Sequence, residues 1–144
     1  MDPMLPVQKG DITGIESLPQ ASLQELLGAL HRVTDLLEAQ RRDEEALSKA
    51  FQEHVERWKS DTMHWSSVTR MIAHPSYLRV IGLARRGCPG DIERLLLREL
   101  QAEPDHWFAA LSAIAGEDPV TEDQNFDEAV EAWLEWGRRK GYLQ

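Results

Sequence analysis

The chain has 144 residues, of which 28% are charged and 42% are hydrophobic. A chain of this length forms one domain of ordinary size, or a smaller domain with an extension, and this excludes a large two-domain enzyme. The formal net charge of −9 disfavours nonspecific attraction to nucleic acid or to anionic lipid. The composition is close to that of globular proteins, so most of the chain is expected to fold.

The cysteine content and the hydropathy pattern indicate the compartment. Cys88 is the single cysteine, which excludes an internal disulfide framework and a multi-thiolate zinc site. No apolar run approaches the ~20 residues that cross a bilayer, and the first residues lack the basic and apolar regions of a signal peptide. We therefore expect a cytoplasmic protein that does not bind membranes.

Residues 1–20 are predicted to form an irregular leader. They contain three prolines and two glycines but few large apolar side chains, a composition that opposes both helix and strand hydrogen bonding.

Residues 21–60 are predicted to form one long helical arm. Ser22 and Glu25 have the spacing of a capping box at a helix start, and apolar residues then recur at the spacing of a coiled coil. We expect this stripe to bind another copy of the chain or another protein through Leu23, Leu26, Leu30, Val33, Leu37, Leu47, Phe51 and Trp58.

An alternative is that the arm breaks into a hairpin within the polar segment 38–45. The residues of this segment are mostly acceptable helix formers, so we favour a continuous, self-associating helix.

Residues 61–144 are predicted to form a compact domain of about four to five short helices, at 61–73, 75–84, 91–102, 104–115 and 126–140. Pro75 and Pro104 favour helix starts. Asn125 can cap the last helix, which has acidic residues in its first turn and basic residues in its last. No segment shows the sustained alternation typical of strands. The fold is therefore expected to be all-α.

Several uncommon residues of this domain stand in a distinctive order: His-Pro-x-Tyr, Ile-Gly, Pro-x-His-Trp-Phe-x-Ala-Leu, Gly-Glu-x-Pro-Val and Trp-Leu-x-Trp-Gly, beginning at His74, Ile81, Pro104, Gly116 and Trp133. In this order the chain resembles a family of small, uncharacterised bacterial proteins from about Phe51 to Tyr142. Ala84, Arg85 and Ala115 depart from the family pattern. The resemblance implies a shared fold and an association with mobile-element or phage contexts, but no catalytic residues.

No residue set combines the types and spacing that catalysis or metal binding requires. His74, Glu103, Asp105 and His106 bring imidazole and carboxylate groups together, yet the two histidines stand at expected helix starts, where an imidazole can satisfy main-chain groups. Metal-binding spacings, phosphate-binding loops and nucleotide fingerprints are absent. We therefore expect no cofactor, no metal and no enzyme activity.

The charges are unevenly distributed along the chain. Residues 61–100 hold six arginines and four acids, and Arg79, Arg85 and Arg86 are candidate phosphate contacts. Residues 117–135 hold eight acids and neither Lys nor Arg. The sequence thus favours a non-enzymatic interaction or adaptor module that binds another protein chain. One alternative is an acidic, antitoxin-like inhibitor of a basic nuclease or nucleic-acid-binding protein. A less favoured one is a nucleic-acid adaptor that uses the arginines.

Overall fold

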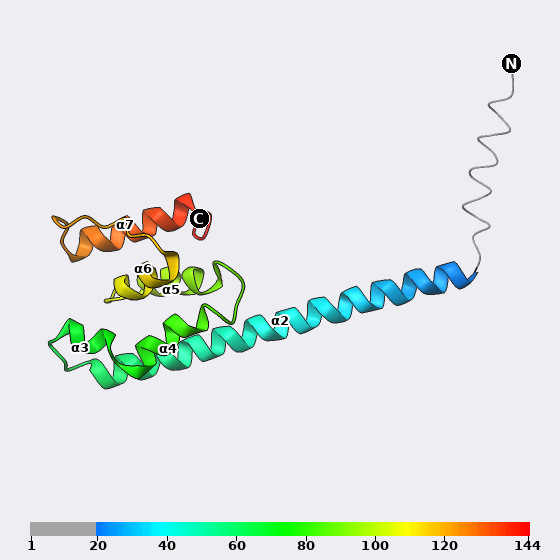
Figure 1. Ribbon diagram of the computed structural model, residues 1–144, viewed down its shortest axis with the longest axis horizontal. Coiled ribbons are helices and arrows are strands. Elements are labelled where there is room, and N and C mark those ends of the chain that lie inside the picture. The colour runs from blue at the N-terminus through cyan, green and yellow to red at the C-terminus, as the bar shows by residue number, and fades with distance from the viewer. Residues whose placement is uncertain (1–19) are drawn as a thin grey trace, which may run out of the picture. The chain divides into compact units, whose positions relative to one another are not determined.

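The computed structural model describes residues 20–144, and side chains from Ser22 onward. The predicted leader, residues 1–20, lies outside the described residues except for its last position. Within the described part of the chain, every regular element is a helix (Figure 1). The prediction of an all-α fold with a long N-terminal helix followed by short helices is confirmed.

Helix α2 spans Gln20–Thr62, a length of 43 residues. It passes through the polar segment 38–45 without interruption, so the alternative of a hairpin break is wrong. Glu38 to Glu45 contain no Gly or Pro to break the main-chain hydrogen bonds of a helix. The helix begins before Ser22, which is therefore a helical residue and not the predicted cap.

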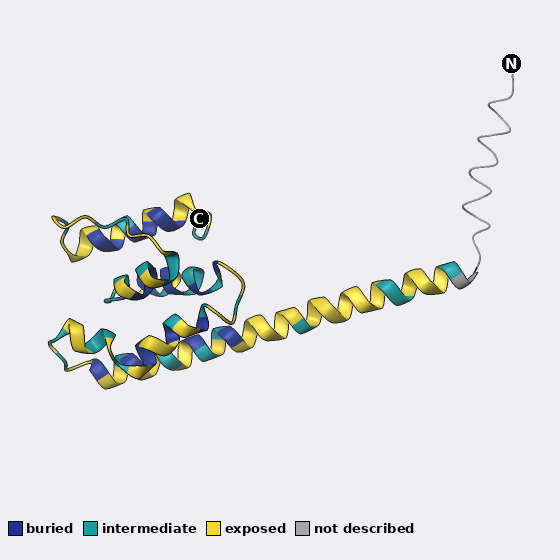
Figure 2. Ribbon diagram, in the orientation of Figure 1, coloured by how far each residue is buried: buried dark blue, intermediate teal, exposed yellow. Residues whose placement is uncertain are grey.

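The chain divides into two units whose boundary falls inside α2, between Arg42 and Asp43. The second unit therefore begins well before the predicted domain boundary at residue 61. The reason is that Leu47, Phe51, Val55 and Trp58, all on α2, are buried in its core (Figure 2).

The second unit contains five short helices after α2. They are α3 (Val68–Ile72), α4 (Pro75–Leu83), α5 (Asp91–Ala102), α6 (Phe108–Ala115) and α7 (Phe126–Arg139). Contacts between helices join α5 to α6 and α7, and α4 to α3 and α6.

Two helix starts differ from the predictions. Helix α3 begins after Ser67, whose side-chain oxygen accepts a hydrogen bond from the Arg70 N–H. The segment 61–73, predicted as one helix, therefore contains the last two residues of α2 and, after an interruption, the short helix α3. Helix α6 begins at Phe108 and not at Pro104. There the Asp105 carboxylate accepts a hydrogen bond from the His106 N–H at 2.7 Å, which favours a turn over a helical start.

Two other helix starts agree with the sequence. The His74 ring accepts a hydrogen bond from the Ser76 N–H, ahead of Pro75 at the start of α4. Asn125 and Glu128 form a reciprocal capping box at the start of α7. Such caps pair main-chain N–H groups that have no partner inside the helix.

Three aromatic side chains from separate segments meet at the centre of the core. Trp58 on α2, Tyr77 on α4 and Trp107 before α6 are each no more than 1% exposed. The rings of Tyr77 and Trp107 stack with centroids 5.1 Å apart, and those of Trp58 and Trp107 are 4.5 Å apart. Because aromatic side chains bury large areas, this cluster holds the C-terminal part of α2 in the folded unit.

Candidate functional site

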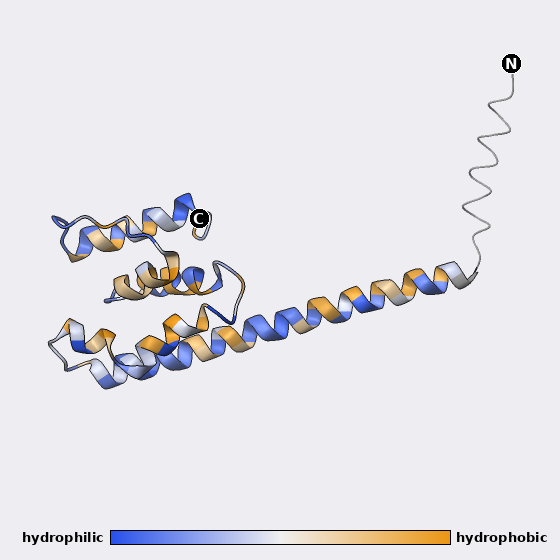
Figure 3. Ribbon diagram, viewed as in Figure 1, coloured by the Kyte–Doolittle hydropathy of each residue, from blue (hydrophilic) through white to orange (hydrophobic). Residues whose placement is uncertain are grey.

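The N-terminal half of α2 carries a continuous exposed apolar face. Seven large apolar side chains between residues 23 and 37 are 47–69% exposed. This half of the helix is mostly yellow in Figure 2 and has repeated orange positions in Figure 3. We call these residues the leucine face: Leu23, Leu26, Leu27, Leu30, Val33, Leu36 and Leu37.

The spacing of the leucine face follows a seven-residue repeat, with positions a to g. Leu23, Leu30 and Leu37 occupy position a, and Leu26 and Val33 occupy position d. In a helix these two positions form one seam, which is the contact line of coiled coils. Gln24, Glu25, His31, Arg32, Asp35 and Glu38 occupy positions b, c and f on the opposite side.

The structure separates the predicted partner-binding residues into two groups. Leu23, Leu26, Leu30, Val33 and Leu37 are exposed on the leucine face, as a binding surface requires. Leu47, Phe51 and Trp58 are at most 7% exposed. These three are covered by the chain's own core, so their assignment as partner contacts is corrected to a core role.

Sequence reasoning missed two members of the face, Leu27 and Leu36. They occupy positions e and g, beside the seam, and are 56% and 69% exposed. They widen the apolar surface beyond a narrow a/d stripe. The signal was present in the sequence, because each is adjacent to a seam residue.

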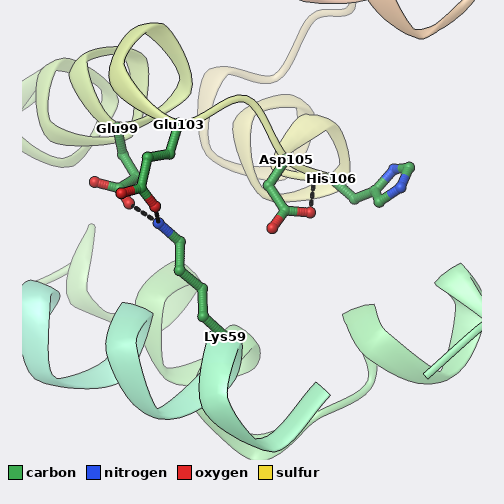
Figure 4. Close-up of polar contacts among 5 residues, drawn as sticks. All are labelled: Lys59, Glu99, Glu103, Asp105 and His106. Atoms are coloured by element: carbon green, nitrogen blue, oxygen red, sulfur yellow. Dashed lines mark hydrogen bonds and ion pairs between the residues drawn. The ribbon is translucent and has the colours of Figure 1, made fainter. Parts of the chain in front are cut away.

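A second candidate is a depression of about 660 Å³ in the folded unit, with both polar and apolar lining residues. Its lining includes Lys59, Met71, Glu103, Asp105 and His106. The Lys59 ammonium donates hydrogen bonds to the carboxylates of Glu99 and Glu103. The Nζ–Oε2 distance to Glu103 is 2.6 Å. Figure 4 shows Lys59 directed at the two glutamates, while the His106 ring points away from them.

The one lysine in this depression is already paired with carboxylates of the same chain. Partial burial opposes the charge on Lys59, but hydrogen bonds to Glu103 and Glu99 outweigh it and raise the pKa of the ammonium above its ordinary value. The hydrogen bond from Lys59 lowers the pKa of the Glu103 carboxyl. A lysine whose pKa is raised is unsuited to act as a general base, which would need a lowered pKa.

The two candidate histidines have structural contacts within the folded unit. His74 caps α4, and its Nε2 lies 3.0 Å from the Asp61 carboxylate. The His106 ring packs edge-on against Phe126, with centroids 5.1 Å apart. The structure therefore does not bring the rings of His74 and His106 together as a catalytic pair, and no group of three or more His, Cys, Asp or Glu residues among those described could hold a metal ion.

The charged candidates lie on the surface of the folded unit. Arg79 is on α4, and Arg85 and Arg86 follow its end; all three are exposed. All eight acids between Glu117 and Glu135 are exposed as well. Part of this acidic charge has partners within the chain. Arg138 pairs with Glu131 and Glu135, and Lys140 with Glu117.

A search for a membrane-spanning helix among the described residues finds none of sufficient length and apolar character. Comparison of the chain with protein-family models, with curated proteins and with solved structures gives no match. The family resemblance therefore stays a prediction.

Proposed function

We propose that the protein is a non-enzymatic interaction module that self-associates through the leucine face. The supporting observation is the exposure of seven large apolar side chains along one helix. Contiguous apolar patches of this kind are uncommon on soluble monomers and mark contact surfaces. Positions a and d are occupied by Leu and Val from residue 23 to residue 37, which is the pattern that pairs helices.

The energetics support association of two such faces. Burying a Leu or Val side chain contributes about 1.5–3 kcal/mol, and each copy would supply seven side chains that are now about half exposed. Association costs roughly 4–15 kcal/mol in lost rigid-body freedom. The free energy of burying the half-exposed side chains of two faces is therefore of the size needed to offset the cost of association.

The test is the mass of the purified protein by sedimentation equilibrium over a wide concentration range. We expect a mass above that of one chain for the wild type and for Gln24→Asp, which changes position b. We expect a single-chain mass for Leu30→Asp, which places a carboxylate in the seam. Both variants introduce the same residue into the same helix, so they share any loss of helix propensity. A single-chain mass for the wild type at all concentrations would contradict self-association.

A second candidate function rests on the acidic segment. Eight exposed acids between Glu117 and Glu135, without an intervening Lys or Arg, form a surface that complements a basic partner such as a nuclease. This function predicts binding to a basic protein that weakens as salt is added. The Leu30→Asp variant would retain it, whereas replacing Glu122, Asp123 and Asp127 by their amides would weaken it.

A further inference from the structure

We propose that two copies of the chain pair antiparallel along the leucine face, with Leu30 of one copy against Val33 of the second copy. This inference rests on the proposed self-association and adds its geometry. Three observations support it: the point at which the folded unit covers the seam, the sizes of the side chains at positions e and g, and the position of Glu44 in the seam.

The first observation is the extent of the free seam. In the same seven-residue register, positions a and d continue from Leu37 through Gln40 and Glu44 to Leu47 and Phe51. Leu47 and Phe51 are buried in the folded unit, so a second helix cannot lie on the seam there. Two parallel helices in register would both have to leave the seam near residue 44.

An antiparallel pair ends where the free seam ends. When Leu30 faces Val33 of the second copy, Leu26 faces Leu37 and Leu23 faces Gln40, because position a meets position d when the directions oppose. Helix α2 of the second copy begins at Gln20, opposite Asp43, where the folded unit begins. The pairing therefore uses the seam from residue 23 to residue 40 on both copies and needs none of the covered positions.

The second observation concerns the residues beside the seam. In antiparallel pairs, position g meets g and position e meets e, which places Leu36 against Ala29 and Leu27 against Thr34 of the second copy. Each contact joins a large side chain to a small one, the arrangement that fills space without overlap. In a parallel pair, g meets e, so Ala29 would face Thr34 and Leu36 would face Arg41. The parallel pair would thus place two small side chains together at the Ala29–Thr34 contact and a leucine beside a charged side chain at the Leu36–Arg41 contact.

The third observation is the carboxylate at Glu44, which occupies position a. Glu44 is the last exposed position of the seam before Leu47, so a parallel pair in register would bring two glutamates together at the end of its paired segment. Such a like-charge contact costs free energy. In the antiparallel pair, Glu44 lies beyond the paired segment. Its place in the structure is a depression of the folded unit that is also lined by Arg94 and Arg98.

The test uses disulfide formation in a Cys88→Ser background, which removes the exposed native thiol. Leu26→Cys and Leu37→Cys are prepared as separate chains of distinguishable mass and are oxidised alone and mixed. A disulfide requires Cα atoms within about 7 Å. In the antiparallel pair, residue 26 of one copy lies eleven residues along the helix from residue 26 of the second copy, about 16 Å at 1.5 Å per residue, and the same holds for residue 37. We therefore expect rapid cross-linking only in the mixture.

Glu25→Cys mixed with Glu38→Cys is the matched control. These residues have the same antiparallel alignment along the helix but occupy positions c and b, away from the seam, so they should not cross-link. Cross-linking of Leu26→Cys to itself would overturn the antiparallel arrangement. A mass of four chains for the uncross-linked protein would overturn the pairing of two copies. A single-chain mass would instead overturn the proposed self-association, so the two failures are distinguishable.

Discussion

The Tyr77 hydroxyl accepts a hydrogen bond from the main-chain N–H of Ala110, at 3.0 Å. The same hydroxyl donates to the main-chain carbonyl of His106, at 2.9 Å. One side chain from α4 thus pairs two main-chain groups at the start of α6, in a part of the chain where Trp107 is fully buried. Burial also raises the pKa of the Tyr77 hydroxyl, so it stays protonated and keeps its ability to donate.

Replacement of Tyr77 by Phe should destabilise the folded unit by about 1–3 kcal/mol, because a buried main-chain donor and acceptor lose their partner. The measurement is the free energy of unfolding in urea. Tyr142→Phe is the control, since the Tyr142 hydroxyl has no hydrogen bond among the described residues. Equal losses for the two variants would show that the paired main-chain groups contribute nothing.

Replacement of Gly137 by Ala should destabilise the contact between α5 and α7 by about 1–3 kcal/mol, through overpacking. An added Cβ would lie 2.7 Å from Leu97 Cδ1 and 3.2 Å from Leu143 Cδ1. Leu97 is fully buried, so it has little room to move. Calorimetry should show a lower melting temperature. Gly82→Ala on α4 is the control, because its added Cβ has no atom within 4 Å, and it should be neutral or stabilising.

Glu117→Gln should change the pH dependence of stability. A hydrogen bond from the Trp136 indole lowers the pKa of the Glu117 carboxyl, and nearby Lys140 lowers it further. A carboxyl whose pKa is lower in the folded state than in the unfolded state stabilises the folded state. This stabilisation is fully present above the unfolded-state pKa, about 4.3, and is lost as pH falls through the folded-state pKa. The melting-temperature difference between wild type and Glu117→Gln should therefore be largest near neutral pH and shrink below about pH 4.

Glu122→Gln is the control for this titration. It removes one negative charge from the same exposed acidic segment but leaves the Trp136 contact intact. A melting-temperature difference that shows the same pH dependence for both variants would attribute the effect to total charge and not to the Glu117–Trp136 hydrogen bond.

The two halves of α2 should respond differently to truncation of their apolar side chains. Phe51→Ala should destabilise the folded unit by about 3–5 kcal/mol, because Phe51 is fully buried and leaves a cavity. Leu30→Ala should change the unfolding free energy of a single chain by less than about 0.5 kcal/mol, because Leu30 is 62% exposed. Urea unfolding at low protein concentration measures both free energies of unfolding. A large decrease for Leu30→Ala would show that Leu30 is buried within the single chain.

These two residues also show how far the sequence could predict the site. Leu30 and Phe51 occupy equivalent positions of one seven-residue pattern, so periodicity predicts an apolar face for both. It cannot show which part is covered, because the cover consists of residues far along the chain, such as Trp107. The residues of the exposed half of the stripe are free to contact a partner, as the prediction requires, whereas the residues of the buried half are covered by the chain's own core.

Helix ends were predictable where one local group determines them. Asn125 with Glu128, and His74 with Pro75, determine the starts of α7 and α4 through side-chain hydrogen bonds and a restricted main chain. Pro104 fits a helix start equally well by its main-chain preference. However, α6 begins only at Phe108, because the His106 N–H donates a hydrogen bond to the Asp105 carboxylate and the Trp107 side chain is buried in the core. Such competition between local and tertiary contacts is not visible in the sequence.

The position of the aromatic residues has a consequence for spectroscopy. All five tryptophans and both tyrosines lie in residues 43–144, and residues 20–42 contain none. Indole fluorescence therefore reports the folded unit alone, whereas far-ultraviolet circular dichroism also reports the helical residues that carry the leucine face. Transition midpoints that differ between the two signals during denaturation would show that the two segments of α2 melt separately.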